Sequence, residues 1–352
     1  MLYTDYSYTQ YTHTHMLSDP IISLLIFCFV VFIYIHMSAE WKKSEDLEVY
    51  ESPFTTPSHL GEICDVKQPV IFTFSPDKLS AFLAKMAQIE KHDACDVLVK
   101  DAREYRVEGA PSPEPVILPL HSAKNLVATD TGAKYLAEQN DAFLEESGLT
   151  ATCASMDWAL RPHACIASKY DYVFGSAGAY TPYRYHTHSR MFIAPITGRV
   201  RVRLAPWKMS KHLWVQKDYE TYEFRSYVDP FSPESLKIKS LDVDVIPGQM
   251  LFVPQYWWYS VKYTKDTTAT TFVYNTAINA MANAWDWTQY FLQQSNITRR
   301  IVAPAELKPN EIPALDSREP TVVESDEPEP IIHATVTEEK KEIITNAGIY
   351  TV

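Results

Sequence analysis

The stretch from Pro247 to Val261 constrains the fold of this chain more than any other part. It opens with a Pro-Gly pair, continues with the short apolar run Met250–Val253 and is stopped by a second proline. Pro-Gly marks a turn, and an apolar run of this length fits a strand rather than a helix. Two tryptophans and Tyr259 follow, and then an alternating stretch that indicates another strand. We therefore expect a turn here that carries the chain between strands.

Residues 157–276 as a whole share this β-dominated pattern, and helical patterns flank them. Short strands at such spacing, separated by turn residues, are typical of a sandwich or a closed barrel. The expected fold class is therefore mainly β with flanking helices. The expected strands are Ala164–Ala167, Tyr170–Phe174, Met191–Pro195, Val200–Leu204, Tyr222–Tyr227, Leu241–Ile246, Met250–Val253, Tyr259–Tyr263 and Ala269–Tyr274, and the expected helices include Ala133–Leu149 and Ala277–Gln294.

The composition excludes some classes of function. Aromatic residues make up 13% of the 352 residues, whereas only 9 are Gly, which favours an aromatic-rich β fold over a Gly-rich nucleotide-binding fold. The formal net charge of −12 argues against a nucleic-acid partner, because phosphate neutralisation needs clustered Lys and Arg. The five cysteines are scattered without a CxxC pair, so we expect a reducing compartment rather than a disulfide framework.

Residues 21–37 form an uncharged apolar stretch of 17 residues. At about 1.5 Å per residue a helix of this length reaches ~26 Å, at the short end for a bilayer span. A signal peptide would have a basic region before the stretch and small residues after it, and neither is clear. We therefore predict a transmembrane helix. Because Lys42 and Lys43 follow it and no basic residue precedes it, the main domain is expected on the cytoplasmic side.

The remaining boundaries follow from changes in composition. Residues 1–20 are a short polar N-terminus and 38–68 are assigned to a tether. The main domain is expected over 69–300, with its barrel core at about 157–276 and a C-terminal helix at 277–294. Residues 301–352 carry 4 basic and 11 acidic side chains and few aromatics, so an acidic, Pro/Glu-rich disordered tail is expected there.

His186 and His188 are the best candidates for metal ligands. A two-residue step along a strand returns a side chain to the same face, so both imidazoles can point to one place inside a barrel. Non-haem iron sites of the oxygenase type use two histidines and a carboxylate. A lone HxH pair is also common in exposed Tyr-rich loops, as His13 and His15 illustrate in this same chain. The pair therefore leaves metal binding and a plain loop as open alternatives.

Several stretches taken together resemble one known family. Residues 178–182, the two histidines, and residues 191–206 run in sequence like the first half of the core of cupin-like, JmjC-type hydroxylases, and residues 247–261 are similar to the second half. The resemblance covers roughly residues 65–295. It implies a double-stranded β-helix that binds Fe(II) and 2-oxoglutarate, with the iron held by an HxD pair and a later histidine.

The ligand positions implied by the resemblance are only partly filled in this chain. His186 takes the first ligand position if one residue is dropped from the following loop, His188 then takes the carboxylate position, and Tyr259 takes the later histidine position. Such a set is neutral and weakens Fe(II) binding. Tyr259 normally titrates near ~10 and would need the metal to lower its pKa.

The cosubstrate positions have changed as well. The lysine that the resemblance implies for 2-oxoglutarate falls on Val200, so the counter-charge would have to come from Arg201 turning inward. Thr181 keeps a hydroxyl where the family often uses one to hold the cosubstrate. Trp257 and Trp258 are candidates for lining a ligand groove, although aromatic side chains near a barrel mouth more often serve packing.

Three functional hypotheses follow from the sequence. The first is a membrane-anchored cupin/JmjC-like protein with a degenerate metal site, no cofactor, and a binding or scaffold role. The second is a 2-oxoglutarate-dependent oxygenase, a protein hydroxylase or demethylase, with shifted ligands. The third is a structural component of a membrane-bound assembly such as a virion. Residues 277–294 are the expected surface for a protein partner or a homodimer.

Overall fold

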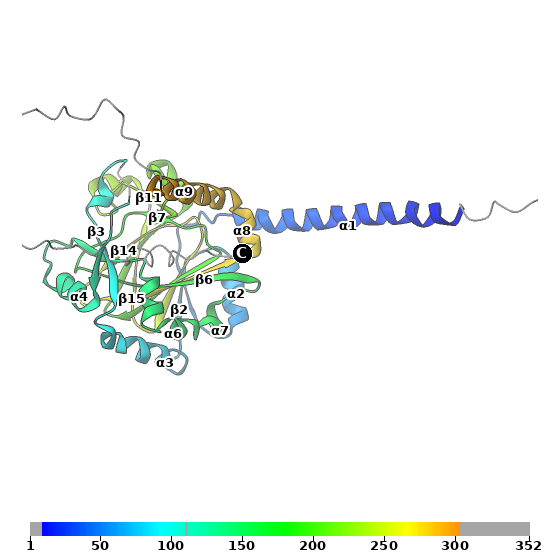
Figure 1. Ribbon diagram of the computed structural model, residues 1–352. Helices are drawn as coiled ribbons and strands as arrows, with labels where there is room; N and C mark the ends of the chain where they lie inside the picture. The colour runs from blue at the N-terminus through cyan, green and yellow to red at the C-terminus, as the bar shows by residue number, and fades with distance from the viewer. Residues whose placement is uncertain (1–8, 110–111, 303–352) are drawn as a thin grey trace, which may run out of the picture. The chain divides into compact units, whose positions relative to one another are not determined.

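The protein is described from a computed structural model, which covers residues 9–109 and 112–302. Residues 1–8 and the acidic tail expected at 301–352 lie outside the described residues, except for Ile301 and Val302. Two β-sheets organise the main domain, and helices cover the outer side of the larger sheet (Figure 1). The architecture is mixed α/β, consistent with a cupin fold, rather than mainly β.

The larger sheet has nine strands and runs mostly antiparallel. In spatial order its strands are β1 (Tyr50–Pro53), β2 (Val70–Thr73), β13 (Gln249–Val253), β8 (Arg190–Thr197), β15 (Thr268–Thr276), β6 (Cys165–Gly175), β5 (Tyr135–Ala137), β3 (Asp96–Asp101) and β4 (Val116–Pro119). The smaller sheet contains, again in order, β10 (Val215–Asp218), β11 (Glu223–Ser226), β7 (Arg184–Tyr185), β14 (Trp258–Tyr263), β9 (Val200–Ala205) and β12 (Leu241–Val245).

The inner faces of the two sheets share one apolar core. Leu251 and Ile193 contribute from the larger sheet, and Val202, Leu204 and Val261 contribute from the smaller one. Alternation along β9 sends Val202 and Leu204 inward, while Arg201 and Arg203 point outward. This period of two confirms the strand expected at Val200–Leu204 and fixes which side chains face the barrel interior.

A second core lies between the larger sheet and the helices outside it. Phe72, Phe192, Phe252 and Phe272 pack there against helical residues such as Phe82. The helices of the domain before the barrel strands are α2 (Pro57–Asp65), α3 (Pro76–Met86), α4 (Leu120–Thr129), α5 (Asp141–Glu146), α6 (Thr150–Ala154) and α7 (Asp157–Leu160). Short 3-10 helices are η1 (Ala87–His92), η2 (Glu104–Arg106), η3 (Trp207–His212) and η4 (Pro233–Lys237).

The helix expected at Ala133–Leu149 is wrong in its first half. Strand β5 lies there instead and pairs with both β3 and β6, so that Leu136 is fully buried. Gln139 then adopts a positive φ of 63°, which interrupts any continuous helix. Only the shorter helix α5 remains.

The tether expected at 38–68 is also wrong over much of its length. Strand β1 pairs in parallel with β2, and helix α2 begins with Thr56 as its N-cap and buries Leu60 and Cys64. The Pro/Ser/Thr-rich composition that suggested a tether here reflects a strand end and a helix start. The folded part therefore begins near Tyr50 and not at residue 69.

The C-terminal helix expected at Ala277–Gln294 is two helices. Helix α8 (Ala277–Ala282) ends at Asn283, and α9 (Ala284–Val302) follows. The Nδ2 group of Asn283 donates to the carbonyls of Thr187 and Asn279. These hydrogen bonds fix the junction between α8 and α9 against the loop that contains His186 and His188.

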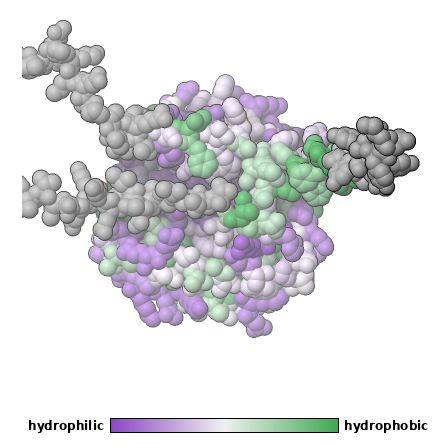
Figure 2. Space-filling view, turned by 45° about the vertical axis from the view of Figure 1, so that its right-hand side comes forward, coloured by the Kyte–Doolittle hydropathy of each residue, from purple (hydrophilic) through white to green (hydrophobic). Residues whose placement is uncertain are grey.

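Helix α1 (Thr9–Trp41) contains the apolar stretch identified in the sequence. Its segment Pro20–Trp41 has 22 residues, none of its apolar window is buried, and it is long and apolar enough to cross a membrane, although a signal sequence would satisfy the same criteria. In Figure 2 this apolar helix contrasts with the largely hydrophilic surface of the domain. Its C-terminal end contacts α8, as Figure 1 also shows.

Candidate functional site

The strands β7 and β14 bring Arg184 directly opposite Tyr259. His186 lies further along the chain, with its ring centroid 6.1 Å from that of Tyr259. The register thus places an arginine beside Tyr259, the position that the resemblance gives to the later histidine. His186 and His188, expected at the other two ligand positions, lie next to this pair.

Arg184 is held by two carboxylates inside the barrel. Its Nη1 and Nη2 atoms donate to the two oxygens of Glu138 at 2.9 and 2.8 Å, and Nη1 also lies 3.4 Å from Glu223. The guanidinium carbon lies 5.4 Å from the ring centroid of Tyr259. Glu138 is only 3% exposed, so this is a bidentate ion pair in the barrel interior.

Further charged side chains extend this pair into what we call the barrel charge network. Arg225, which is 1% exposed, lies 3.5 Å from Glu223 and 3.4 Å from Asp218. The network consists of Glu138, Arg184, Asp218, Glu223 and Arg225. Each of its two arginines contacts two carboxylates, which is how buried charges are tolerated.

The network fixes the protonation of the residues at its centre. Burial disfavours the charge on Arg184, but the carboxylates of Glu138 and Glu223 raise the pKa of this arginine well above its usual value. Burial also raises the pKa of Tyr259, although the Arg184 charge opposes the shift. At neutral pH the site therefore presents a guanidinium and a neutral phenol.

The two histidines lie beside this pair with their rings stacked. Their ring centroids are 5.6 Å apart, with an angle of 17° between the planes. His186 donates from Nε2 to the carbonyl of Val253 at 3.0 Å, and His188 Nδ1 lies 3.1 Å from Asn275 Oδ1. Burial, with a smaller effect from His188, lowers the pKa of His186 to about 3, and burial lowers that of His188 to about 4. Both imidazoles are neutral at pH 7.

These residues do not fit an Fe(II) ion. A guanidinium has no lone pair to donate, Tyr259 holds its proton, and Nε2 of His186 is used by a backbone carbonyl. Over residues 9–109 and 112–302, no three His, Cys, Asp or Glu side chains are grouped so that they could hold a metal ion. The positive charge of Arg184, already neutralised by carboxylates, lies beside Tyr259, the position that the resemblance gives to a ligand.

Arg201 and Thr181, the two residues expected to bind 2-oxoglutarate, both form hydrogen bonds with other residues of the domain. Arg201 does not turn inward: it lies on the outer face of β9, half exposed, and pairs with Asp244 at 2.8 Å. The expectation for Arg201 is therefore wrong, because alternation along β9 places Val200 and Val202 inside. Thr181 is buried, and its hydroxyl accepts from the Val261 amide at 2.9 Å.

The two tryptophans serve packing. Trp257 is buried in the barrel core, whereas Trp258 packs on the opposite side of its sheet among the tyrosines near η3. The Nε1 atom of Trp258 donates to Ser210 Oγ at 2.8 Å. Neither residue lines the pocket described next, and both are at most 1% exposed.

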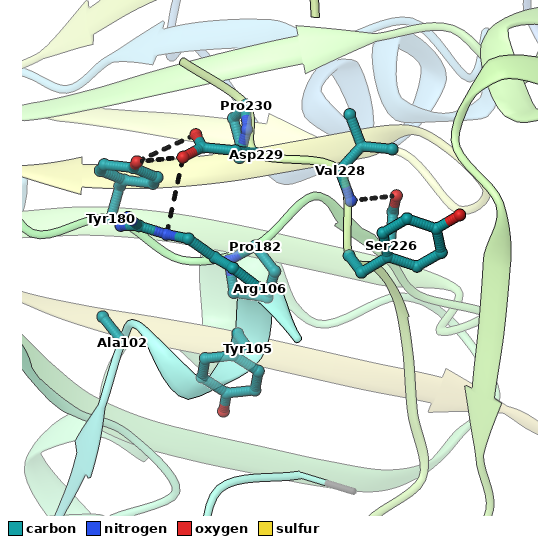
Figure 3. Close-up of a pocket in the computed structure, with 10 residues that line it drawn as sticks. Ala102, Tyr105, Arg106, Tyr180, Pro182, Ser226, Val228, Asp229 and Pro230 are labelled. Atoms are coloured by element: carbon teal, nitrogen blue, oxygen red, sulfur yellow. Dashed lines mark hydrogen bonds and ion pairs between the residues drawn. The ribbon is translucent and has the colours of Figure 1, made fainter. Parts of the chain in front are cut away.

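One small pocket lies between η2, the segment before β7 and the loop after β11 (Figure 3). Tyr180 Oη donates to the carboxylate of Asp229 at 2.8 Å, and Arg106 lies 3.6 Å from the same carboxylate. Figure 3 shows these side chains closing one wall, with Pro182 and Tyr105 below them. Because its polar groups satisfy one another, this pocket offers little to a ligand.

The barrel charge network was not predicted from the sequence, although the sequence contains a weak indication of it. Glu223 and Arg225 alternate with Phe224 in a strand between aromatic residues, and Glu138 follows the buried pair Leu136–Ala137. A charge inside an apolar stretch is rarely buried unless it is paired. The partners, however, are up to 46 residues apart in the chain, and only the fold joins them.

Comparison with known proteins agrees with this architecture. A family model described as "Cupin-like domain" matches residues 62–285. A 95-residue stretch, 25% of this chain, is 30% identical to HSPB1-associated protein 1 from Bos taurus. The match spans about a fifth (20%) of the length of that relative.

Proposed function

The chain belongs to the cupin-like domain family, and we propose that it is a membrane-anchored member whose barrel binds or scaffolds a partner without catalysing oxidation. The observation that carries the proposal is the bidentate pair between Arg184 and Glu138 beside Tyr259. A fixed guanidinium beside a ligand position opposes a divalent cation by its charge, and it has no lone pair to offer as a ligand.

The name of the similar bovine protein describes an association with another protein. That name supports a binding role for the shared domain, although the match covers only part of each chain. We expect the partner to be a protein rather than a nucleic acid, because the net charge of −12 repels phosphate.

A direct test of the barrel uses the full chain in detergent or nanodiscs. Mn(II) is added as a stand-in for Fe(II), and binding of 2-oxoglutarate is followed by the relaxation of its own NMR signals. We expect no metal-dependent broadening, because the ligand positions do not suit a metal and the arginines inside the barrel are already paired with carboxylates. Saturable, Mn(II)-dependent broadening together with succinate formation under Fe(II) and oxygen would overturn the non-catalytic assignment.

Helix α1 supports the membrane anchor. It presents apolar side chains on all sides, and its apolar window is entirely exposed, as expected for a surface covered by lipid. Lys42 and Lys43 follow its end, which favours a cytoplasmic domain.

The anchor and its orientation are tested together by making the chain in microsomes. Asn296 begins an Asn-Ile-Thr sequon and is exposed on α9, so it reports on which side the domain lies. We expect the full chain, with an N-terminal tag retained, to resist carbonate extraction and to stay unglycosylated. Loss of the tag by cleavage would identify a signal sequence instead, and glycosylation of Asn296 would place the domain on the opposite side.

An oxygenase with shifted ligands is favoured by one observation. Nδ1 of His186 is buried and has no hydrogen-bond partner among the residues described. If His186 and His188 bind a metal, Co(II) titration of the full chain should give visible absorption that His186→Ala and His188→Ala abolish and His121→Ala retains. Absence of that absorption, or its persistence in both variants, excludes these two ligands.

A further inference from the structure

The end of α1 is fastened to the domain rather than joined by a loose linker. Glu40 Oε2 accepts hydrogen bonds from Gln255 Nε2 and Asn279 Nδ2, both at 3.1 Å. Trp41 Nε1 donates to the carbonyl of Ala282 at 3.0 Å, and Lys67 lies 3.6 Å from Glu40. Because Gln255 and Asn279 are each 1% exposed, these bonds tie the helix to buried parts of the barrel rim.

The distance along α1 from the end of its apolar stretch to Trp41 determines how close α8 would lie to a bilayer that α1 spans. Trp41 is four residues beyond Met37, the last residue of the uncharged stretch, which is a rise of about 6 Å in a helix. The polar layer of each leaflet is roughly 5–8 Å thick. Since Trp41 bonds to Ala282, a bilayer spanned by α1 would have the end of α8 at the depth of its headgroups.

Four apolar side chains are exposed at this place, and we call them the juxtamembrane face: Trp41, Ile166, Met281 and Trp285. They are 46%, 60%, 42% and 71% exposed. Met281 is on α8 and Trp285 is in the first turn of α9. Ile166 follows Cys165, which pairs with Thr276 immediately before α8.

The exposure of Trp285 is not explained by packing within the domain. On the same helix Asp286 accepts from Tyr219 Oη at 2.7 Å, and Trp287 stacks on Tyr222 with centroids 4.6 Å apart. That side of α9 therefore faces the barrel. Because successive residues of a helix are rotated by about 100°, Trp285 points away from the barrel. Tryptophan is favoured at the boundary between headgroups and acyl chains.

We propose that the juxtamembrane face rests in the headgroup layer of the same bilayer that α1 spans, so that the domain is held against the membrane in one orientation. The lipid surface is the occupant that fits, because the four side chains adjoin the point where α1 leaves the domain. This inference rests on the proposed membrane anchor, and its test separates the two.

The test uses the full chain in phosphatidylcholine nanodiscs, with Cys28, Cys95 and Cys165 replaced by serine and the buried Cys64 and Cys153 retained. The fluorophore NBD is attached to single cysteines in Trp285→Cys, Ile117→Cys or Ile26→Cys. Ile117 is the matched control, because it is 63% exposed on β4 at the edge of the larger sheet. Nitroxide lipids labelled on the headgroup or on the acyl chain serve as quenchers.

We expect headgroup nitroxide to quench NBD at position 285 about threefold more than at position 117, and acyl-chain nitroxide to quench position 26. Equal quenching at 285 and 117, with position 26 quenched, overturns the docked face but leaves the anchor in place. Position 26 unquenched overturns both. NBD at 285 shielded from lipid and also from aqueous iodide shows that another protein surface covers it, which overturns lipid as the occupant.

Discussion

Arg184 shows how a single side chain changes the chemistry of this barrel. It is 18% exposed and pairs with Glu138 and Glu223, so removing its charge leaves the buried Glu138 without its ionic partner and Glu223 with Arg225 alone. We expect Arg184→Met to lower the free energy of unfolding by about 3–5 kcal/mol, as for other broken buried pairs. Urea denaturation of the full chain in detergent measures the loss.

Arg201→Met is the matched control for that substitution. Arg201 also pairs with a carboxylate, Asp244, but it does so in solvent. Exposed pairs contribute little, so we expect its denaturation midpoint to stay close to that of the unsubstituted chain. Equal losses from the two substitutions would mean that Arg184 is not held in a buried pair.

His186 predicts a dependence of stability on pH. Its pKa is lowered from 6.5 to about 3 in the folded chain, so the unfolded chain binds the extra proton first as the pH falls. The contribution of neutral His186 to the free energy of unfolding is complete above pH 6.5 and is lost as the pH falls from 6.5 to about 3. The slope from this histidine is about 1.4 kcal/mol per pH unit in that window.

His186→Gln isolates this effect, because glutamine can donate to the Val253 carbonyl but does not titrate. The free energy of unfolding is measured at pH 7, 6 and 5. As the pH falls, it should decrease less steeply for His186→Gln than for the unsubstituted chain, by about 1.4 kcal/mol per pH unit, which is the slope for one proton. Parallel curves for the two chains would show that His186 is not buried in its neutral form.

The sequence could place His186 and Tyr259 inside the barrel, because the alternation of side chains along a strand and the family resemblance can both be recognised in a short stretch of sequence. It could not identify Arg184 as the neighbour of Tyr259, because that depends on the register between β7 and β14. With only two residues, β7 gives almost no local pattern. A one-residue shift in register exchanges the inward and outward side chains.

Among the structural elements, the turn between β8 and β9 depends on Gly198. Its φ is +67°, and a Cβ there would lie 2.5 Å from Thr267 Oγ1 and 2.9 Å from Thr267 Cα. Gly148 also has a positive φ, of +71°, but a Cβ there meets nothing within 4 Å. We expect Gly198→Ala to destabilise the chain by about 2 kcal/mol more than Gly148→Ala, measured by urea denaturation. Similar losses would mean that the turn has room to relax.

The connection between α1 and α8 depends on Asn279. Its Nδ2 donates to Glu40 Oε2 at 3.1 Å and to the Thr187 carbonyl at 2.9 Å. Asn279→Asp replaces this donor with a carboxylate facing two acceptors, which we expect to cost about 2–4 kcal/mol and to loosen the end of α1. Hydrogen exchange should become faster at residues 38–43 and 277–282. The exposed Asn296→Asp is the control, and unchanged exchange in Asn279→Asp would contradict a fastened helix.

The helix expected at Ala133–Leu149 shows why some elements could not be predicted. Leu136 is buried whether the segment is a helix or a strand, so its apolar character does not decide between them. Pairing of β5 with β3 and β6 decides it, and those partners lie about 35–40 residues away in the chain. Tertiary pairing here overrides the local preference for a helix.

For the molecule as a whole, the barrel and the apolar helix were the most predictable parts. Short strands between turns indicated a sandwich or a closed barrel, and the structure has two sheets. The family resemblance over 65–295 agrees with the match over 62–285. The contact of Trp41 with Ala282 was not predictable, because the segment after the apolar stretch has the composition of a linker. Such long-range hydrogen bonds leave no periodicity in the sequence.

The central claim is that the barrel charge network has replaced a metal centre. Anaerobic equilibrium dialysis of the full chain against Fe(II) and 2-oxoglutarate, with iron counted per chain, tests it most directly. We expect far less than about 0.1 equivalent of iron, because Arg184 lies beside Tyr259 with its charge already paired. Close to one equivalent of iron, lost on His186→Ala, would contradict this account.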